Sequence, residues 1–156
     1  MNTDVVIAAR TLASWAHAGQ VDKQGRDYFG YHLKPVADLL APFGPFAIAA
    51  GWLHDVLEDT DVTVEDLVGY DFPGPVILAV VAVTRKPGEL YMDRIRKIGM
   101  HRLATIVKLA DNWVNLTGLD DLARCPVGAS DAERLRARYV SARALLEAAL
   151  AYGDGD

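Results

Sequence analysis

Cysteine is almost absent from this sequence of 156 residues, because Cys125 is its only thiol. A single thiol cannot form an internal disulfide, and sparse cysteine is typical of proteins from reducing compartments. We therefore expect Cys125 to be a partly buried thiol in the loop before Pro126, and not a nucleophile.

The sequence also lacks a long hydrophobic run. The most apolar stretch, residues 46–57, is interrupted by His54 and Asp55 and falls short of the roughly 20 apolar residues that span a bilayer. The first residues are polar and lack the basic and apolar regions of a signal peptide. We therefore expect a cytoplasmic protein without membrane contact.

Positive charge is in deficit. There are 16 lysines and arginines against 21 aspartates and glutamates, which gives a net charge of −5. Surfaces that bind nucleic-acid polymers are usually basic, so this class of partner is not expected. A small anionic molecule remains allowed, because a local cluster of cations or a metal ion can override the overall charge.

What the sequence does contain is helical periodicity. We predict an all-α fold in one domain, residues 1–152, with a frayed tail at 153–156. Residues 76–83 are rich in β-branched side chains, but no second such run could pair with them as a strand. Trp15, Trp52 and Trp113 are expected in the core, although Trp113 could also border a pocket. The expected helices cover residues 2–18, 32–43, 46–59, 73–83, 89–98, 101–119 and, capped by Ser130 or Asp131, the segment to Leu150. A further short helix is expected to start at Thr63, with Asp66 completing its capping pair.

Four polar residues follow the apolar part of the central helix. His54 and Glu58 are four residues apart, and so are Asp55 and Asp59, which puts them in two adjacent columns of a helix. Burying such groups costs several kcal/mol each unless a partner compensates, and a metal ion is such a partner. Mixed imidazole and carboxylate ligands suit manganese, iron or zinc better than calcium. The alternative is a helix end that is simply solvated.

A second polar pair, Asp111 and Asn115, lies on one face of a later helix. By itself this spacing indicates a structural hydrogen bond, but beside the first cluster Asp111 becomes a candidate fourth ligand. His32 alone would be a helix cap or a surface group. We expect His17 to support the site, and His101 to lie on the surface.

Together these segments resemble the HD-domain phosphohydrolases, and most closely the hydrolase domain of RelA/SpoT enzymes and the small alarmone hydrolases. The resemblance covers roughly residues 8–120 and rests on a specific pairing of two motifs, His54-Asp55-x-x-Glu58-Asp59-Thr60 and Lys108-Leu109-Ala110-Asp111-x-x-x-Asn115. Further matches are Ala16-His17-x-Gly19-Gln20, Lys23-x-Gly25-x-x-Tyr28, His32-x-x-x-Val36-Ala37 and Val83-Thr84-Arg85.

The resemblance implies an HD-type helical bundle that removes pyrophosphate from the 3′ position of guanosine tetra- or pentaphosphate. It implies that Mn²⁺, or another divalent transition metal, is held by His32, His54, Asp55 and Asp111. Glu58 and Asp59 would orient or deprotonate the attacking water, and Lys23 and Asn115 would contact the nucleotide. A synthetase domain is not expected, because the residues after about 120 suffice only for a loop and one helix.

The sequence departs from the family pattern mainly where substrate would bind. Asp22 and Asn112 each replace a common arginine, and Asp22 would repel phosphate. Smaller departures are Asp27, His32-Leu33 and Pro73-Gly74-Pro75. Three hypotheses therefore stay open: an alarmone hydrolase, a hydrolase of another nucleotide or phosphate ester, and a catalytically silent nucleotide-binding module.

Two groups of cationic residues also have alternative interpretations. One group could line a phosphate pocket and consists of Lys23, Arg26, Arg85, Lys86 and Lys108. Within it, Arg85-Lys86 could equally be a solvated helix end. The last helix carries an arginine-rich face that either forms a homo-oligomer contact or is solvated, made of Arg134, Arg136, Arg138 and Arg143.

Overall fold

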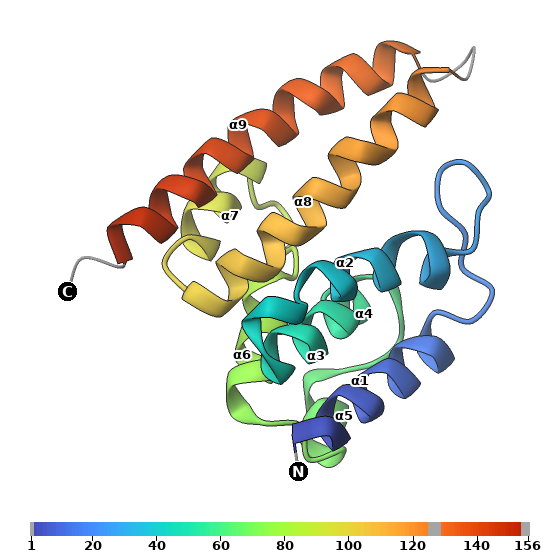
Figure 1. The fold of residues 1–156 in the computed structure, drawn as a ribbon, viewed down its shortest axis with the longest axis vertical. Coiled ribbons are helices and arrows are strands. Elements are labelled where there is room, and N and C mark those ends of the chain that lie inside the picture. Colours follow the sequence, from blue (N-terminus) through green and yellow to red (C-terminus); the bar gives the residue numbers. More distant parts are fainter. Residues whose placement is uncertain (1, 125–128, 154–156) are drawn as a thin grey trace.

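The computed structural model describes residues 2–124 and 129–153, and over these ranges the regular elements are all helices. The all-α prediction is confirmed. Figure 1 shows the arrangement. The elements are α1 (Asn2–Ala16), a π-helical turn η1 (Phe29–Leu33), α2 (Lys34–Leu39), a 3₁₀ turn η2 (Ala41–Phe43), α3 (Pro45–Leu53), α4 (Val56–Asp59), α5 (Val64–Gly69), α6 (Gly74–Val83), α7 (Tyr91–Ile98), α8 (Arg102–Ala123) and α9 (Ala129–Gly153).

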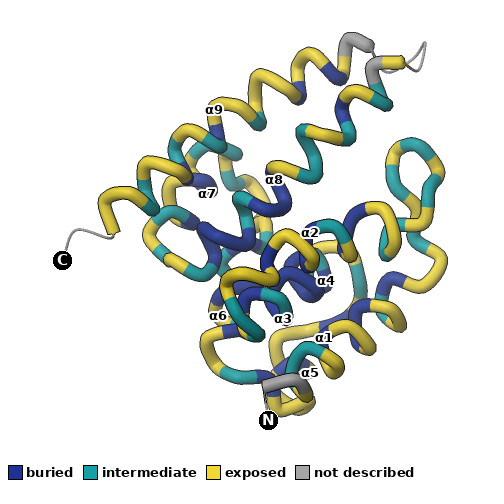
Figure 2. Tube along the Cα trace, viewed as in Figure 1, coloured by how far each residue is buried: buried dark blue, intermediate teal, exposed yellow. Residues whose placement is uncertain are grey.

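Helix α3 lies at the centre of the molecule, packed against α1, α2, α6 and α8. Its residues are apolar on nearly every side, as expected for a buried helix, and Figure 2 shows its C-terminal part in the colour of buried residues. Gly51 allows the close approach of α2, because a Cβ there would overlap the Leu40 side chain. The long helices α8 and α9 pack along each other, and α8 is the one of the two that packs against α3.

The sequence predicts one central helix that continues to Asp59, but the structure divides this segment into two helices. Helix α3 ends at Leu53, and α4 begins after a break at His54 and Asp55. The His54 side chain supplies the reason, because its Nδ1 lies 2.7 Å from the Gly51 carbonyl oxygen. In a continuous helix that carbonyl would accept from the backbone N–H four residues later. The helix is therefore interrupted where its polar residues begin.

Other predicted elements agree with the structure in kind and differ at their ends. Thr63 and Asp66 form the reciprocal capping box of α5, and the β-branched run forms helix α6. Helix α8 extends beyond the predicted residue 119, and α9 begins before both predicted caps and continues to Gly153. The predicted loop position of Cys125 and the predicted frayed tail, 154–156, lie outside the described residues.

The tryptophan prediction is correct for one residue of three. Trp52 is buried and stacks on Phe29, with ring centroids 4.9 Å apart. Trp15 is 70% exposed and Trp113 is 47% exposed, so neither belongs to the core. Trp113 instead lies at the edge of a cavity described below. In the part of the chain that the structure describes, none of the helices is long and apolar enough to cross a membrane.

Candidate functional site

The breaks at both ends of the α2–α3 hairpin bring His32, His54 and Asp55 together. His32 lies in the π-helical turn before α2, and the other two lie in the break after α3. The Nε2 atoms of His32 and His54 are 3.1 Å apart. Asp55 Oδ2 lies 3.4 Å from the first and 2.9 Å from the second. This is a group of three side chains that could hold a metal ion.

Asp111 reaches the same point from α8. Its Oδ1 atom lies 3.2 Å from His32 Nε2 and 3.5 Å from His54 Nε2. Asn115, one turn later on α8, donates from Nδ2 to this oxygen at 2.9 Å. The other oxygen, Oδ2, pairs with Lys108 Nζ at 2.6 Å. Helix α8 therefore supplies an aspartate that is held in place by residues on either side of it.

Neighbouring contacts fix how the two imidazoles and Asp55 are oriented. A proton on Nδ1 of His54 would be donated to the Gly51 carbonyl oxygen, which leaves Nε2 with the lone pair. Tyr28 donates its hydroxyl to Asp55 Oδ2 at 2.5 Å. The Tyr28 ring also stacks on the ring of His32, with centroids 4.9 Å apart. Tyr28 entered the sequence argument only as part of a motif, and its contacts with both residues are a finding of the structure.

The charge distribution at this point requires a cation. Neutral imidazole nitrogens and carboxylate oxygens are all acceptors, so their convergence is unfavourable unless a proton or metal ion lies among them. Burial lowers the pKa of His54, but Asp55 and Asp111 outweigh burial and raise that pKa well above its ordinary value. Burial likewise raises the pKa of Asp111, but Lys108 and the two histidines hold it well below the usual range. The donor set therefore fits a divalent metal ion.

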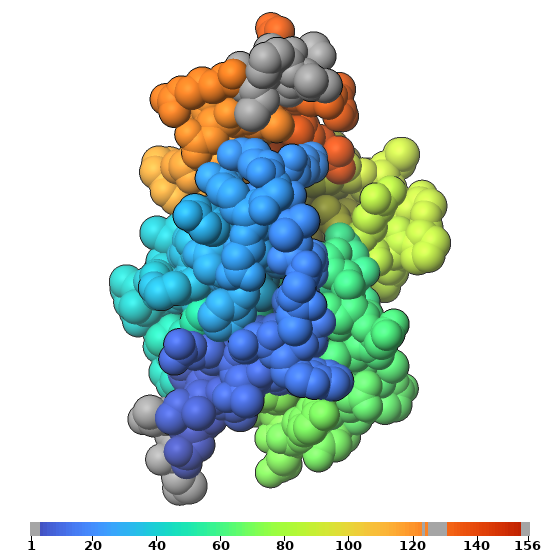
Figure 3. All heavy atoms as spheres, turned by 90° about the vertical axis from the view of Figure 1, so that its right-hand side faces the viewer, coloured from blue at the N-terminus to red at the C-terminus, as the bar shows by residue number. Residues whose placement is uncertain are grey.

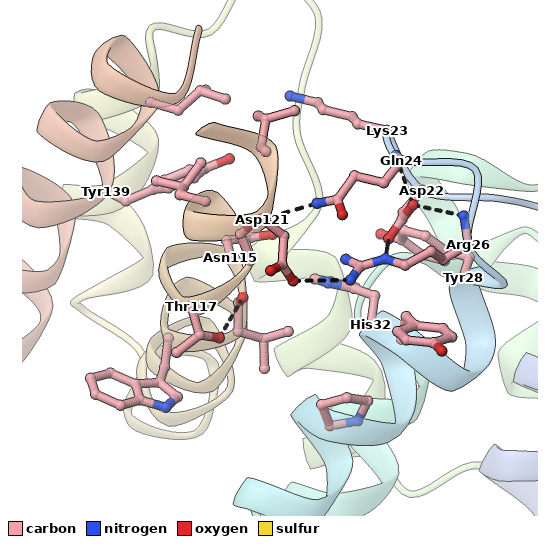
Figure 4. A pocket seen from close by; sticks show the side chains of 18 of the residues that line it. Asp22, Lys23, Gln24, Arg26, Tyr28, His32, Asn115, Thr117, Asp121 and Tyr139 are labelled. Atoms are coloured by element: carbon pink, nitrogen blue, oxygen red, sulfur yellow. Dashed lines mark hydrogen bonds and ion pairs between the residues drawn. The ribbon is translucent and has the colours of Figure 1, made fainter. Parts of the chain in front are cut away.

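A cavity of about 860 Å³ begins at His32 and extends between the loop after α1 and the C-terminal half of α8. This is the size of a pocket for a small organic ligand. Figure 4 shows Lys23 and Asn115 among the side chains around it, on opposite walls. Trp113, Leu135 and Tyr139 supply apolar and aromatic surface. The two residues that the resemblance assigns to substrate thus line the same cavity.

The loop of residues 20–28 forms one wall of this cavity and lies on the molecular face shown in Figure 3. Asp22 organises the loop by accepting backbone hydrogen bonds from Gln24 and Arg26 with Oδ1 and an ion pair from Arg26 Nε with Oδ2. Burial raises the pKa of Asp22, but these contacts outweigh burial and lower it. The expected repulsion of phosphate by Asp22 is therefore offset, because a guanidinium group pairs with this carboxylate.

Asn112, the second residue that replaces a common arginine of the family, lies away from the cavity wall that contains Asp22. Its side chain is buried, and its Nδ2 donates to the backbone oxygen of Tyr139 on α9. It is not among the described residues that line the cavity. An uncharged residue here suits a buried helix contact.

Glu58 and Asp59 are exposed. They make their contacts away from the cluster of His32, His54, Asp55 and Asp111. Glu58 Oε1 accepts from the Arg85 backbone N–H at 2.7 Å and lies 3.4 Å from an Arg94 nitrogen. Asp59 accepts from Gln20, whose other amide atom lies 2.6 Å from His17 Nδ1. The structure links neither carboxylate to the cluster by a hydrogen bond or ion pair within the described residues, and neither lines the cavity.

Arg94 was not identified from the sequence. It is 8% exposed, although it lies in a helix with charged residues on its other face. A usable signal existed, because Tyr91, Arg94 and Ile98 recur at spacings of three and four and so share the face that packs inward. Arg85 and Lys86 are exposed at the end of α6, and His101 is a partly buried cap that accepts from the Ala104 backbone N–H.

Comparison with known proteins gives a consistent group of relatives. No family model matches the chain. A guanosine-3′,5′-bis(diphosphate) 3′-pyrophosphohydrolase, MESH1, of Danio rerio is 32% identical over 86% of this chain and 78% of its own length. A probable enzyme of the same name from Synechocystis is 34% identical over 69% of this chain, and a GTP pyrophosphokinase of Streptomyces coelicolor is 35% identical over 74%.

The chain spans only about 15% of the Streptomyces protein and 16% of the Synechocystis protein. Among solved structures, one described as a metazoan ortholog of SpoT that hydrolyzes ppGpp matches with a TM-score of 0.68. The match covers 95% of this chain and 94% of that one, at 21% identity. It shows that the two chains share a fold.

Proposed function

The chain belongs to the family of guanosine-3′,5′-bis(diphosphate) 3′-pyrophosphohydrolases, and from this premise we propose that it removes pyrophosphate from the 3′ position of that nucleotide. The observation that carries the proposal is the convergence of two imidazole Nε2 atoms and two carboxylates beside a cavity of nucleotide size. The substrate class is then a small-molecule nucleotide that bears a 3′-pyrophosphate.

His32, His54, Asp55 and Asp111 would hold the metal ion, with Mn²⁺ or another divalent transition metal as the cofactor. Their mixed nitrogen and oxygen donors support this choice, since such sets favour transition metals over calcium or magnesium. Such an ion would polarise a phosphoryl oxygen of the substrate and lower the pKa of a nearby water. The hydrogen bond from Tyr28 to Asp55 and the pairing of Lys108 with Asp111 would keep both carboxylates oriented.

Glu58 and Asp59 would orient the attacking water or accept its proton. A carboxylate in this role typically contributes a factor of about 10²–10⁴ in rate. Their place in α4, directly after Asp55, supports the assignment. The contacts of Glu58 with Arg94 and of Asp59 with Gln20 would restrict their rotamers before substrate arrives.

Lys23 and Asn115 would bind the nucleotide. Lys23 is exposed on the cavity wall and offers a mobile positive charge to phosphate. Asn115 lines the opposite wall and is already bonded to Asp111, so it would orient the substrate next to the cluster.

The first experiment is an assay of pyrophosphate release from guanosine 3′,5′-bis(diphosphate) by the manganese-loaded protein. We expect release that is abolished in Asp55→Ala and retained in Asp61→Ala, a matched control at an exposed aspartate outside the cavity. Absence of release from a folded, metal-loaded wild-type protein would overturn the proposed substrate.

A second candidate is a hydrolase of another nucleotide or phosphate ester. The residues lining the cavity include three carboxylates, Asp22, Asp38 and Asp121, against two cationic side chains, Lys23 and Arg26. This balance is unfavourable for a polyanion unless the metal supplies charge. A panel of phosphate esters and nucleotides separates this candidate from the first, and nucleotide binding without turnover of any member would identify a silent module.

A further inference from the structure

Arg26 is the better oriented of the two cationic side chains, Lys23 and Arg26, among the described residues that line the cavity. Its Nε donates to Asp22 Oδ2 at 2.8 Å, and its guanidinium carbon lies 4.8 Å from the centre of the Tyr31 ring. Figure 4 shows this guanidinium on the cavity wall between His32 and Asp121. A planar group held by an ion pair and a ring contact is a preorganised anion-binding site.

The hydrogen-bonding capacity of Arg26 is only partly used. A guanidinium has five N–H donors, and Asp22 engages only the one on Nε. The contact of Nη1 with Asp121 is longer, at 3.3 Å, and the Asp121 side chain is 47% exposed. Exposed ion pairs of this kind are weak, so a phosphate could take the place of Asp121 at little cost.

The position of Arg26 relative to the four proposed metal ligands determines which part of a bound nucleotide Arg26 would contact. Under the proposed function, the 3′-pyrophosphate lies against His32, His54, Asp55 and Asp111. The rest of the nucleotide must then extend into the cavity that begins at His32, along the wall formed by the loop of residues 20–28. The 5′-phosphates are the anionic groups in this remaining part.

We propose that Arg26 binds the 5′-phosphates of the substrate and is a specificity-determining residue of this chain. Asp22 positions its guanidinium through the ion pair at Nε, and Asp121 is the partner that the phosphate displaces. The inference rests on the proposed function and adds to it the residue that distinguishes nucleotides with 5′-phosphates from those without. It also explains how a loop that carries Asp22 can bind a polyanion.

The test compares two substrates, guanosine 3′,5′-bis(diphosphate) and guanosine 3′-diphosphate, which lacks 5′-phosphates. In Arg26→Ala we expect KM for the first to rise about 10- to 100-fold, the cost of one or two charge-assisted hydrogen bonds, with kcat unchanged. KM for the second is expected to stay constant. An equal rise for both substrates, or no rise for either, would overturn the proposal.

The matched control is Arg124→Ala. Arg124 also pairs with Asp121, at 3.0 Å, but its side chain is 77% exposed and it does not line the cavity. The variant removes the same charge from the same neighbourhood, so a KM change equal to that of Arg26→Ala would show a general charge effect and overturn the proposal. Circular dichroism and thermal melts of both variants check that the fold is retained.

A binding measurement keeps this inference separate from the proposed function. Calorimetric titration of the metal-free protein with GDP, and with guanosine as the control, requires no turnover. We expect Arg26→Ala to weaken GDP binding about tenfold or more and to leave guanosine unchanged. If the wild-type protein hydrolyses neither nucleotide, the proposed function fails and GDP binding still decides the role of Arg26. Equal GDP affinity in both proteins would overturn that role.

Discussion

At the scale of single residues, the site depends on how each carboxylate is neutralised. Asp111 is buried between the two imidazoles on one oxygen and Lys108 on the other. Burial lowers the pKa of Lys108, but Asp111 outweighs burial and raises it, so the lysine is charged. Lys108 was considered in the sequence as a phosphate-binding group, and the structure places it instead as the ion-pair partner of Asp111.

Replacing Lys108 by methionine should therefore destabilise the metal-free protein. The change leaves the Oδ2 atom of the buried Asp111 carboxylate without its cationic partner, and breaking a buried pair in this way costs about 3 kcal/mol or more. Urea unfolding in the presence of a chelator measures the loss.

Lys34→Met is the control for this variant, because the Lys34–Asp38 pair is exposed on both sides. Its cost should stay below about 1 kcal/mol. Equal losses for the two variants would contradict the assigned role of Lys108.

Metal affinity should fall as the pH falls. The ion needs deprotonated imidazoles, and the carboxylates raise the pKa of both His32 and His54 despite the opposing effect of burial. Metal binding must therefore displace protons, and its affinity should increase with pH until both imidazoles are neutral. Calorimetric titration with Mn²⁺ at several pH values, in buffers of different ionisation enthalpy, measures affinity and proton release together.

The stability of the metal-free protein should change with pH in the opposite direction to the metal affinity. A pKa that is higher in the folded state stabilises the protein fully below the unfolded histidine value of about 6.5, and the contribution is lost as the pH rises through the folded value. We expect unfolding of the chelated protein to become easier from about neutral pH upward. In the metal titration, proton uptake instead of proton release would contradict the raised pKa of His32 and His54.

At the scale of elements, the breaks in the α2 and α3 segments are what assemble the site. The π-helical turn before α2 orients His32, and the interruption after α3 orients His54 and Asp55. Gly51 connects these features, since its carbonyl holds His54 and its missing side chain makes room for Leu40. The spacing of the two helices and the direction of one imidazole therefore depend on the same residue.

Gly51→Ala should accordingly affect both stability and metal binding. The added methyl would overlap Leu40, and overpacking of this kind costs about 1–3 kcal/mol. Shifting α3 away from α2 also moves the carbonyl that orients His54, so Mn²⁺ affinity should fall. Thermal unfolding and metal titration measure the two effects.

Gly69→Ala is the control for Gly51→Ala, because a Cβ at Gly69 would meet nothing within 4 Å. We expect it to leave metal affinity unchanged. If Gly51→Ala keeps the stability and the Mn²⁺ affinity of the wild type, the added methyl does not displace α3 and the role assigned to Gly51 is wrong.

At the scale of the whole molecule, the four residues that we propose as metal ligands connect three parts of the fold. They come from the turn before α2, the break after α3 and the middle of α8. A ligand that binds all three should stabilise their packing in the folded state alone. The long α8–α9 pair would then be linked to the rest of the domain through Asp111 as well as through apolar contacts.

Metal should therefore raise the melting temperature. At a concentration about 100 times the dissociation constant, binding adds about 2.7 kcal/mol, which corresponds to about 5–10 °C for a domain of this size. Differential scanning fluorimetry with Mn²⁺ or a chelator measures the shift. In Asp55→Ala the shift should disappear, whereas Asp61→Ala should behave as the wild type; a shift that persists in Asp55→Ala would place the metal elsewhere.

The sequence by itself determined the fold class and most helices, and it predicted which residues carry the chemistry. Helical periodicity and capping pairs such as Thr63 and Asp66 depend on neighbours in the chain, so they can be read without a structure. The motifs that contain His54-Asp55 and Asp111 are likewise local. Trp15 and Trp113 could not be placed in this way, because apolar spacing does not tell how far a neighbouring helix extends.

Only the tertiary structure decided how these residues meet. The contact of His54 with Gly51 ends α3 early, and the packing of α8 brings Asp111 within 3.5 Å of both imidazoles. The partners of Asp22, Glu58 and Lys108 could not be assigned from the sequence, because an ion pair or hydrogen bond depends on side-chain direction and on the dielectric around it. Local patterns therefore predicted the functional groups, and packing determined their contacts and orientation.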